Sequence, residues 1–354
     1  MKYLIVVFTF ILITTSCKSN DDTEIIMNND FYQSYYEENI LLSLEKFTEE
    51  LEVLKQYVLD FETSNSDIDY DKLTTQWLVT AKAYSRAEIY NFGLIKQRFF
   101  DINIYNYPIN TTQIENNITE EANYDANYFT TKSTVIKGLG TLEYLLFKDF
   151  NPKIAKAELL NDTSRLDYVL GVTDELIRQA NLMINTWQTE YLNIYTNANE
   201  SLCSNNAKCL TINQIINVLD VAKVTKIGKP SGFEKSDNVS PNSLEAYRSR
   251  NSLALIEAIL SEVEYVYFTS KTNISSLVNS IDNTNKISTQ IQNKLNTIDQ
   301  EIILFNNNLH DGITSNPESI RPIYNALKEL NILFAVDISS ILSITVLPTD
   351  NDGD

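Results

Sequence analysis

The chain has 354 residues, with 28 basic residues against 47 acidic ones and a formal net charge of −19 at pH 7. A charge of this sign argues against nucleic acid and anionic lipid surfaces as binding partners. Only 8 glycines and 7 prolines are present, too few for a turn-rich β protein. The length exceeds what one hydrophobic core usually serves, so we expect two domains.

Residues 1–16 are predicted to be a targeting signal and not part of the fold. Lys2 is followed by an apolar run, residues 3–13, which is too short for a membrane span of about 20 residues. Small residues then precede Cys17, in a pattern similar to a bacterial lipobox, which predicts cleavage before Cys17 and lipid attachment to it. An ordinary signal peptide with an incidental cysteine is the alternative. Residues 17–30 are then a polar tether to a lipid membrane, on the periplasmic side or at the cell surface.

Residues 31–200 are predicted to form an N-terminal helical bundle. Between residues 40 and 61 apolar side chains recur every three or four residues, which indicates an amphipathic helix. A second helix is expected from about Asp67 to Gly93, and in it Glu88 joins the apolar face. Two more helices are expected at residues 135–147 and 152–195, with an irregular excursion over residues 101–130.

Residues 201–354 are predicted to form a C-terminal helical bundle. Its helices are expected at residues 210–224, 243–269, 275–305 and 317–341. Residues 226–232 have the composition of a loop, and residues 344–347 have β character. No period of about 20–50 residues repeats, which argues against a solenoid. The predicted fold class is all-α, with two tandem antiparallel helical bundles and a cleft between them.

Two cysteines remain once Cys17 is assigned to lipid. Cys203 and Cys209 flank a short polar stretch that is able to close on itself. An oxidising envelope compartment favours a local disulfide between them. Such a bond would fix the conformation of a loop where the first bundle gives way to the second.

The stretch 136–147 places a carboxylate within an apolar helix surface. At helical spacing Gly140 and Glu143 fall on one face, with leucines beside them. A carboxylate in that position has to be paired, hydrogen-bonded, metal-bound or protonated. Glu88 also lies on the core side of its helix, so Glu143 and Glu88 are the candidate metal ligands. The alternative is that Glu143 binds a backbone amide, a tyrosine or a basic side chain of a neighbouring helix.

Several motifs resemble those of one protein family in the same chain order. Gly138 and Glu143 match a Gly-x-His-x-x-Glu motif, and Gly140 occupies the position of its histidine. The other matching stretches are residues 77–93, residues 226–232, residues 245–252 and the acidic residues 350–354. On these residues the chain is identified as a member of the imelysin-like family of bacterial envelope proteins.

The resemblance implies two helical bundles with a groove that the motif helix faces. Members of the family include iron-regulated envelope proteins and a periplasmic component of ferrous iron uptake, and some were described as metallopeptidases. The resemblance therefore implies a metal ion or metal-bearing compound as ligand, iron first, and an envelope uptake protein as partner. A site made of carboxylates, tyrosines and water would prefer hard cations such as ferric iron, manganese or calcium.

Peptidase chemistry has little support in the residues. A zinc peptidase needs about three protein ligands and a general base, and no His-Glu-x-x-His occurs. The single histidine, His310, lies in an Asn-, Asp- and Gly-containing stretch typical of a loop. No catalytic residue is therefore assigned. The sequence predicts a non-catalytic binding component, with a cell-surface scaffold protein as the alternative and a metallopeptidase as a distant third.

Overall fold

All regular structure in the described part of the chain is helical. The computed structural model describes residues 30–120, 123–148, 150–197, 202–235 and 238–351. Within those ranges no strand occurs, which confirms the all-α prediction. The predicted signal, Cys17 and most of the tether lie outside the described residues. No helix in the described ranges is both long enough and apolar enough to cross a membrane.

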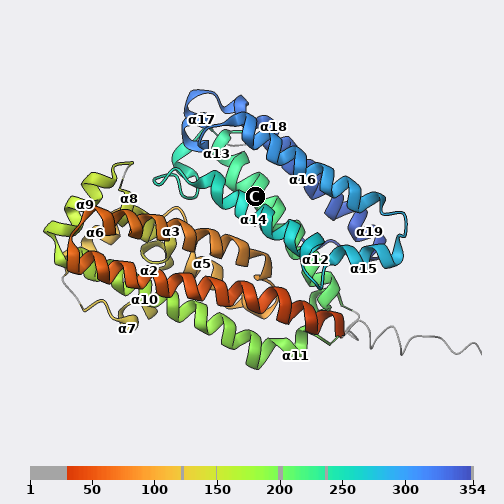
Figure 1. Cartoon of the computed structure of the whole chain (residues 1–354), viewed down its shortest axis with the longest axis horizontal. Coiled ribbons are helices and arrows are strands. Elements are labelled where there is room, and N and C mark those ends of the chain that lie inside the picture. The colour runs from red at the N-terminus through yellow and green to blue at the C-terminus, as the bar shows by residue number, and fades with distance from the viewer. Residues whose placement is uncertain (1–29, 121–122, 149, 198–201, 236–237, 352–354) are drawn as a thin grey trace, which may run out of the picture.

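The first bundle is formed by long helices in red to green in Figure 1. α2 (Leu42–Ser64) packs against both α3 (Asp67–Ala87) and α10 (Thr163–Thr186), and α8 (Leu139–Phe147) lies between α3 and α10. The periodic apolar side chains of the first predicted helix are buried in this core, as expected for an amphipathic helix. The shorter helices are α4 (Leu94–Gln97), α5 (Phe100–Ile104), α6 (Thr111–Thr119), α7 (Ala126–Thr130), α9 (Pro152–Asn161) and α11 (Leu192–Tyr195).

The second bundle contains the later helices of the chain, drawn in blue-green to blue in Figure 1. α18 (Arg321–Ile332) packs against α12 (Ala207–Lys223) and α16 (Lys286–Phe305), and α14 (Ser252–Glu264) packs across onto α3 of the first bundle. The shorter helices are α13 (Lys229–Ser231), α15 (Ile274–Ile281), α17 (Leu309–Ser315) and α19 (Ser339–Ile341). The predicted division between residues 200 and 201 lies outside the described residues.

Some predicted boundaries were wrong, for local reasons. The predicted helix 275–305 is two helices, because the polar residues 282–285 separate α15 from α16. Asp162 divides another predicted helix, and its carboxylate accepts the Ser164 amide at 3.0 Å to cap α10. The predicted loop 226–232 is largely helical, since α12 continues through a π-helical turn, Val224–Gly228, into α13. Residues 344–347 pair with no strand and lie extended beside α12.

The two cysteines of the second half are bonded to each other in the structure. Cys203 and Cys209 form a disulfide with a Cα–Cα distance of 5.2 Å. Cys209 belongs to the first turn of α12, so the bond holds the short turn that precedes α12 against that helix. Both sulfur atoms lie beside the carbonyl oxygen of Thr345, at 3.3 and 3.4 Å. The disulfide therefore also contacts the extended segment that comes after α19.

Candidate functional site

The backbone around the motif helix leaves no space for side chains at two glycines. Gly138 precedes α8 with φ +84°, and a Cβ there would lie 2.6 Å from the carbonyl oxygen of Ile104. A Cβ on Gly140 would lie 2.6 Å from the carbonyl oxygen of Asn106 and 3.1 Å from the side chain of Ile109. The segment 105–109 therefore packs directly onto α8 where the family motif carries its histidine.

Glu143 is buried in α8 and is bound to the second bundle. Its side chain accepts a hydrogen bond from the backbone N–H of Ser249 at 2.8 Å, and the residue is only 3 % exposed. Burial raises the pKa of Glu143 to about 7, although the Ser249 amide and Arg248 act in the opposite direction. The gap beside it, which Gly140 and Tyr107 also line, measures about 10 Å³ and is at the lower limit for one water molecule.

Glu88 belongs to a separate group of charges that joins the two bundles. It comes directly after α3 in the short 3₁₀ turn Glu88–Tyr90, and its carboxylate lies 3.2 Å from Nζ of Lys226. Lys226 lies in the π-helical turn after α12, and its Nζ is 2.6 Å from the carboxylate of Glu245. The side chains of Lys226 and Glu245 are 4 % and 2 % exposed, and that of Glu88 is 16 % exposed. These three residues are called the charge triad below.

The ammonium group of Lys226 lies between the carboxyl groups of Glu88 and Glu245. Burial raises the pKa of Glu88 to about 7, with Lys226 opposing and Glu245 reinforcing the shift. Burial alone would lower the pKa of Lys226, but the carboxylates of Glu245 and Glu88 raise it above its ordinary value. Lys226 is therefore a charged ammonium at neutral pH.

A cavity of about 130 Å³ lies beside the charge triad, between the bundles. Two polar atoms of its lining residues, the Tyr105 hydroxyl and the Asn91 side-chain oxygen, are buried without a hydrogen-bond partner among the described residues. Such groups are costly unless a water or ligand binds them. We call this the inter-bundle cavity. Its lining residues are Tyr84, Glu88, Asn91, Asp101, Tyr105 and Tyr107 from the first half, and Gln214, Asn217, Val218, Val221, Lys226, Glu245 and Asp350 from the second.

The structure does not combine Glu88 and Glu143 into one ligand set. Tyr107 lines both the inter-bundle cavity and the gap beside Glu143, so the two carboxylates occupy neighbouring compartments. Burial raises the pKa of Tyr105, and the charges of Glu245, Glu143 and Glu88 raise it further, in keeping with its place among them. Within the described ranges no three His, Cys, Asp or Glu side chains are placed to hold a metal ion together.

Sequence patterns do not identify several of the residues that line the inter-bundle cavity. Lys226 belongs to the predicted loop, and Glu245 stands out only as part of a family element. Tyr105 and Tyr107 lie in a stretch without helical period, where periodicity carries no information. The signal in the sequence is indirect: Lys226 and Glu245 both belong to stretches that resemble the family, and nothing in those stretches indicates that the two side chains meet.

His310 is placed outside the inter-bundle cavity. It lies in the first turn of α17, not in a loop, and its ring packs on Phe150 with 4.5 Å between ring centres. Its ring nitrogens lie 3.0 Å from the side-chain oxygen of Asn242 and 3.3 Å from that of Asp311. His310 therefore fixes the packing of the first turn of α17.

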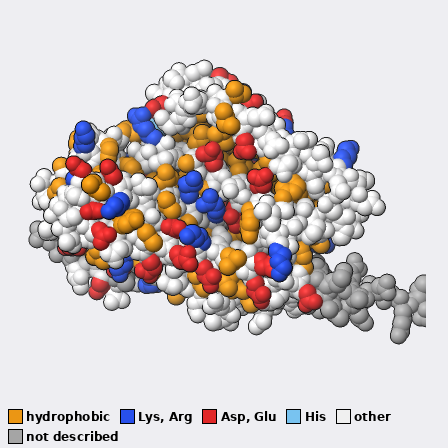
Figure 2. All heavy atoms as spheres, viewed as in Figure 1, with side chains coloured by type: hydrophobic (Ala, Val, Ile, Leu, Met, Phe, Trp, Pro, Cys, Tyr) orange, Lys and Arg blue, Asp and Glu red, His pale blue; other side chains and the backbone are white. Residues whose placement is uncertain are grey.

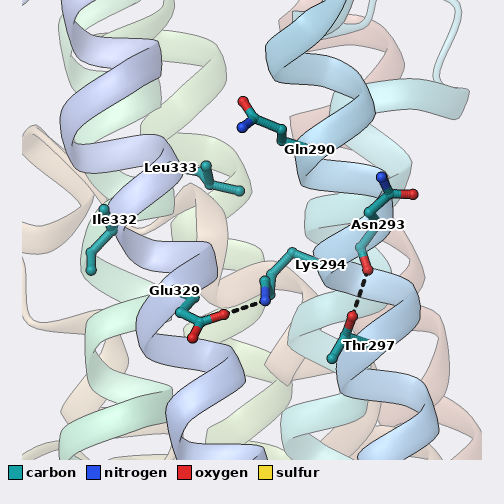
Figure 3. Close-up of a pocket in the computed structure, with 7 residues that line it drawn as sticks. All are labelled: Gln290, Asn293, Lys294, Thr297, Glu329, Ile332 and Leu333. Carbon is teal, nitrogen blue, oxygen red and sulfur yellow. Dashed lines mark hydrogen bonds and ion pairs between the residues drawn. The ribbon is translucent and has the colours of Figure 1, made fainter.

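A larger groove of about 370 Å³ lies between α16 and the helix formed by α18 and its π-helical continuation, Leu333–Ile338. Figure 3 shows that Lys294 of α16 and Glu329 of α18 form an ion pair across it. Neither predicted glutamate reaches this groove, and its remaining lining is uncharged. The full lining is Gln290, Asn293, Lys294, Thr297, Glu329, Ile332 and Leu333.

Comparison with known proteins places the fold. Residues 41–332 match the family model described as Imelysin. The structure is similar to that of an imelysin-like protein from Psychrobacter arcticum 273-4, with TM-score 0.77 and 17 % identity over 92 % of this chain and 98 % of that one. It is also similar to a "putative iron-regulated protein A precursor" from Parabacteroides distasonis ATCC 8503, with TM-score 0.68 and 17 % identity over 90 % and 97 %. At this identity the likeness shows the fold alone. No curated protein matches the chain.

Proposed function

The chain belongs to the imelysin family, and from that premise we propose that it is a non-catalytic binding protein of the bacterial cell envelope. Its ligand site is the inter-bundle cavity. Cys17 carries the lipid that holds it to a membrane, a proposal that rests on the apolar run and the small residues before that cysteine. An envelope uptake protein is the proposed receiver of the ligand.

The observation that carries this proposal is the pair of unpartnered polar groups in the cavity. Tyr105 is 6 % exposed, and its hydroxyl has no hydrogen-bond partner among the described residues. The side-chain oxygen of Asn91, another residue that lines the cavity, also has no hydrogen-bond partner among the described residues. A ligand that accepts from the hydroxyl and donates to the amide oxygen would satisfy both. Concave sites between bundles that hold a few convergent polar groups are the usual places for small ligands.

The proposed ligand is a metal-bearing compound, with iron as the metal, and not a bare ion. Iron is proposed as the metal because the structure is similar to that of a protein named as iron-regulated. A bare cation would meet the ammonium of Lys226 between the two carboxylates, and like charges at such distances repel strongly in a buried site. A chelate can instead present its own oxygen atoms to Lys226 and Tyr105. The residues present do not fit a resident metal ion, because Gly140 supplies no ligand and Glu143 is bound to Ser249.

The surface charge is consistent with solubility and does not point to a ligand. On the face drawn in Figure 2, acidic side chains are spread over both bundles with basic ones among them. We therefore base the ligand class on the cavity and not on the net charge of −19.

Calorimetric titration tests the proposal. The full chain is titrated separately with ferric citrate, ferrous, ferric, zinc and calcium ions. We expect one-to-one binding of the ferric chelate that Tyr105→Phe weakens about tenfold, because that variant lacks the hydroxyl proposed to donate to the chelate. The matched control is Tyr70→Phe, because the Tyr70 hydroxyl donates to the backbone carbonyl of Leu146 inside the first bundle and Tyr70 does not line the cavity.

Two results would contradict the proposal. Binding of a bare ion alone, lost in Glu143→Gln, would restore the predicted metal site. Absence of any binding would favour the second candidate, a cell-surface scaffold protein. The close packing of Asn106 on Gly140 is the observation that supports this second function, since it fills the motif site.

A further inference from the structure

The extended segment after α19 forms part of the inter-bundle cavity. Residues 344–351, here the C-terminal strap, run beside α12, and Asp350 lines the cavity. Asn213 and Thr225 are twelve residue steps apart, which is a rise of about 18 Å along a helix. Thr345 and Asn351 are six residue steps apart, which spans at most about 20 Å. The two lengths match, so the strap can stay in register with the helix along its course.

Polar side chains of α12 hold the strap at successive turns. Asn213 donates to the carbonyl of Thr345 at 2.9 Å and accepts the amide of Leu347 at 2.7 Å. One turn further, Asn217 accepts the amide of Asp350 at 2.8 Å and donates to its carboxylate at 2.9 Å.

The end of the strap is held in the same way. The carboxylate of Asp220 accepts from the side chains of Thr349 and Asn351, at 2.9 and 3.0 Å. Thr225 donates to Asn351 at 2.7 Å. Asp350 also forms an ion pair with Lys96 of the first bundle.

The strap has little apolar attachment of its own. Leu342 is the last buried residue before it, and no residue of 343–351 is buried. Val346 is 43 % exposed, and the Lys96–Asp350 pair is exposed at both ends. The strap is therefore held mainly by part-buried side-chain hydrogen bonds to α12 and by few apolar contacts, and a segment with few buried apolar contacts opens readily in a folded protein.

The inter-bundle cavity is small, so a ligand can enter only if part of its wall moves. About 130 Å³ is well below the roughly 300 Å³ or more of usual ligand sites. The helices that form the other walls carry the buried cores of both bundles. Of the strap only Ile344 packs against the buried core, and the other attachments described above are polar.

We propose that the C-terminal strap is a detachable wall of the inter-bundle cavity, and that its release from α12 admits the ligand to the charge triad. The identity of the cavity as a ligand site rests on the proposed function. The movement of the strap does not, because it is measured without any ligand.

A thiol placed in the cavity reports the opening. Asn91→Cys is made in the full chain with Cys17→Ser, while Cys203 and Cys209 stay oxidised, and its rate of reaction with a maleimide is measured. Hydrogen exchange at the amides of Leu347 and Asp350 reports release of the strap on the same samples.

Asn213→Ala and Asp220→Ala are the test variants, because both side chains hold the strap and neither lines the cavity. Each should raise the thiol rate and the amide exchange rates about tenfold, and the double variant should raise them further. The matched control is Asn331→Ala. Its amide donates to the Ile216 carbonyl of α12 at 2.8 Å and does not contact the strap, so both rates should stay unchanged.

Either of two results overturns the proposal. In the first, the amides of the strap exchange faster while the thiol rate is unchanged, which means that the ligand route lies elsewhere. In the second, both rates are unaffected in the double variant, which means that these contacts do not hold the strap closed. Retained helical circular dichroism establishes that each variant is folded, and Asn213→Ala and Asp220→Ala serve as independent replicates.

Discussion

The carbonyl oxygen of Asn106 lies 2.6 Å from the position that a Cβ on Gly140 would take. This contact fixes the segment that carries Tyr105 and Tyr107 against the motif helix. It also means that the space for a motif histidine is filled by backbone, which cannot move aside as a side chain could.

Gly140→Ala should therefore destabilise the protein by about 1–3 kcal/mol, the usual cost of overpacking. Gly140→His should cost more, and it should not create a zinc site. Urea denaturation of the full chain measures the first effect, and zinc titration of the folded variant measures the second. A Gly140→His variant of unchanged stability that binds zinc would show that the segment 105–109 moves aside easily.

Glu143→Gln should stabilise the protein above neutral pH. The folded-state pKa of Glu143 is about 7 against an ordinary value of 4.5, so the folded protein binds this proton more tightly than the unfolded chain. Wild-type stability therefore falls as pH rises from about 4.5 to about 7, and the uncharged amide avoids that loss. The gain should reach up to about 3 kcal/mol at pH 8 and vanish near pH 4.5.

The matched control for that pH dependence is Glu175→Gln. Burial opposes the ionisation of Glu175, but Arg178, Gln179 and Lys137 outweigh it and hold its pKa below the ordinary value. The Glu175 variant should therefore be less stable than wild type at pH 8. If both variants shift stability in the same direction at pH 8, burial does not govern the titration of Glu143.

Lys226→Met should destabilise the protein by about 3–5 kcal/mol at pH 8, because it leaves the carboxylates of Glu88 and Glu245 buried without their cation. The loss should be smaller at pH 5, because the Glu88 carboxyl group, whose pKa burial raises to about 7, is protonated there. Urea midpoints at the two pH values measure this. Adding Glu88→Gln and Glu245→Gln to Lys226→Met should recover most of the stability, and failure to do so would assign the loss to packing of the lysine chain.

Tyr105→Phe should leave stability within about 0.5 kcal/mol of wild type, since it removes a hydroxyl that has no partner among the described residues. The same change should weaken binding of the ferric chelate about tenfold. Tyr70→Phe is the matched control, because the Tyr70 hydroxyl donates to backbone carbonyls of Leu146 and Pro152 inside the first bundle. That control should lose stability and keep its binding.

Replacing both Cys203 and Cys209 by Ser should cost about 2 kcal/mol, the chain-entropy value for so short a closed loop. Because both sulfur atoms lie against the carbonyl of Thr345, the amide of Leu347 should also exchange faster. Thermal unfolding and hydrogen exchange measure the two effects. Cys17→Ser is the control for loss of a sulfur atom. If the Leu347 amide exchanges at the same rate in Cys17→Ser and in the double cysteine variant, the disulfide does not hold the strap in place.

Periodicity was enough to predict the all-α fold, because long helices bury one stripe of side chains whatever the details of their ends. The same reasoning located Glu143 inside the structure and offered binding to a backbone amide as one of its alternatives. It could not predict that Ser249 supplies that amide, since two turns about 100 residues apart must first meet across the bundles. Position along one helix carries no information about which surface of another bundle will cover it.

The charge triad was beyond sequence reasoning for a related reason. Lys226 lies in a stretch rich in Gly, Pro and Ser, where a loop is the ordinary expectation. The structure continues the helix there with a wider turn, which aims the lysine inward. The local composition of residues 226–232 predicted a loop, whereas packing between the bundles holds most of that stretch in a helix.

The wide turn at Val224–Gly228 has an evolutionary consequence. A π-helical turn contains one residue more than an ordinary turn, so a single-codon deletion upstream of Lys226 could convert it to regular α-helix. Because the wide turn accommodates this extra residue, its removal would leave the helix beyond the turn in register and change the direction of Lys226, which lies within the turn. A lysine displaced in this way would leave the carboxylates of Glu88 and Glu245 facing each other without their cation. Relatives that are one residue longer or shorter in this stretch should accordingly differ in the charged groups that their interiors contain, even where the remaining residues are the same.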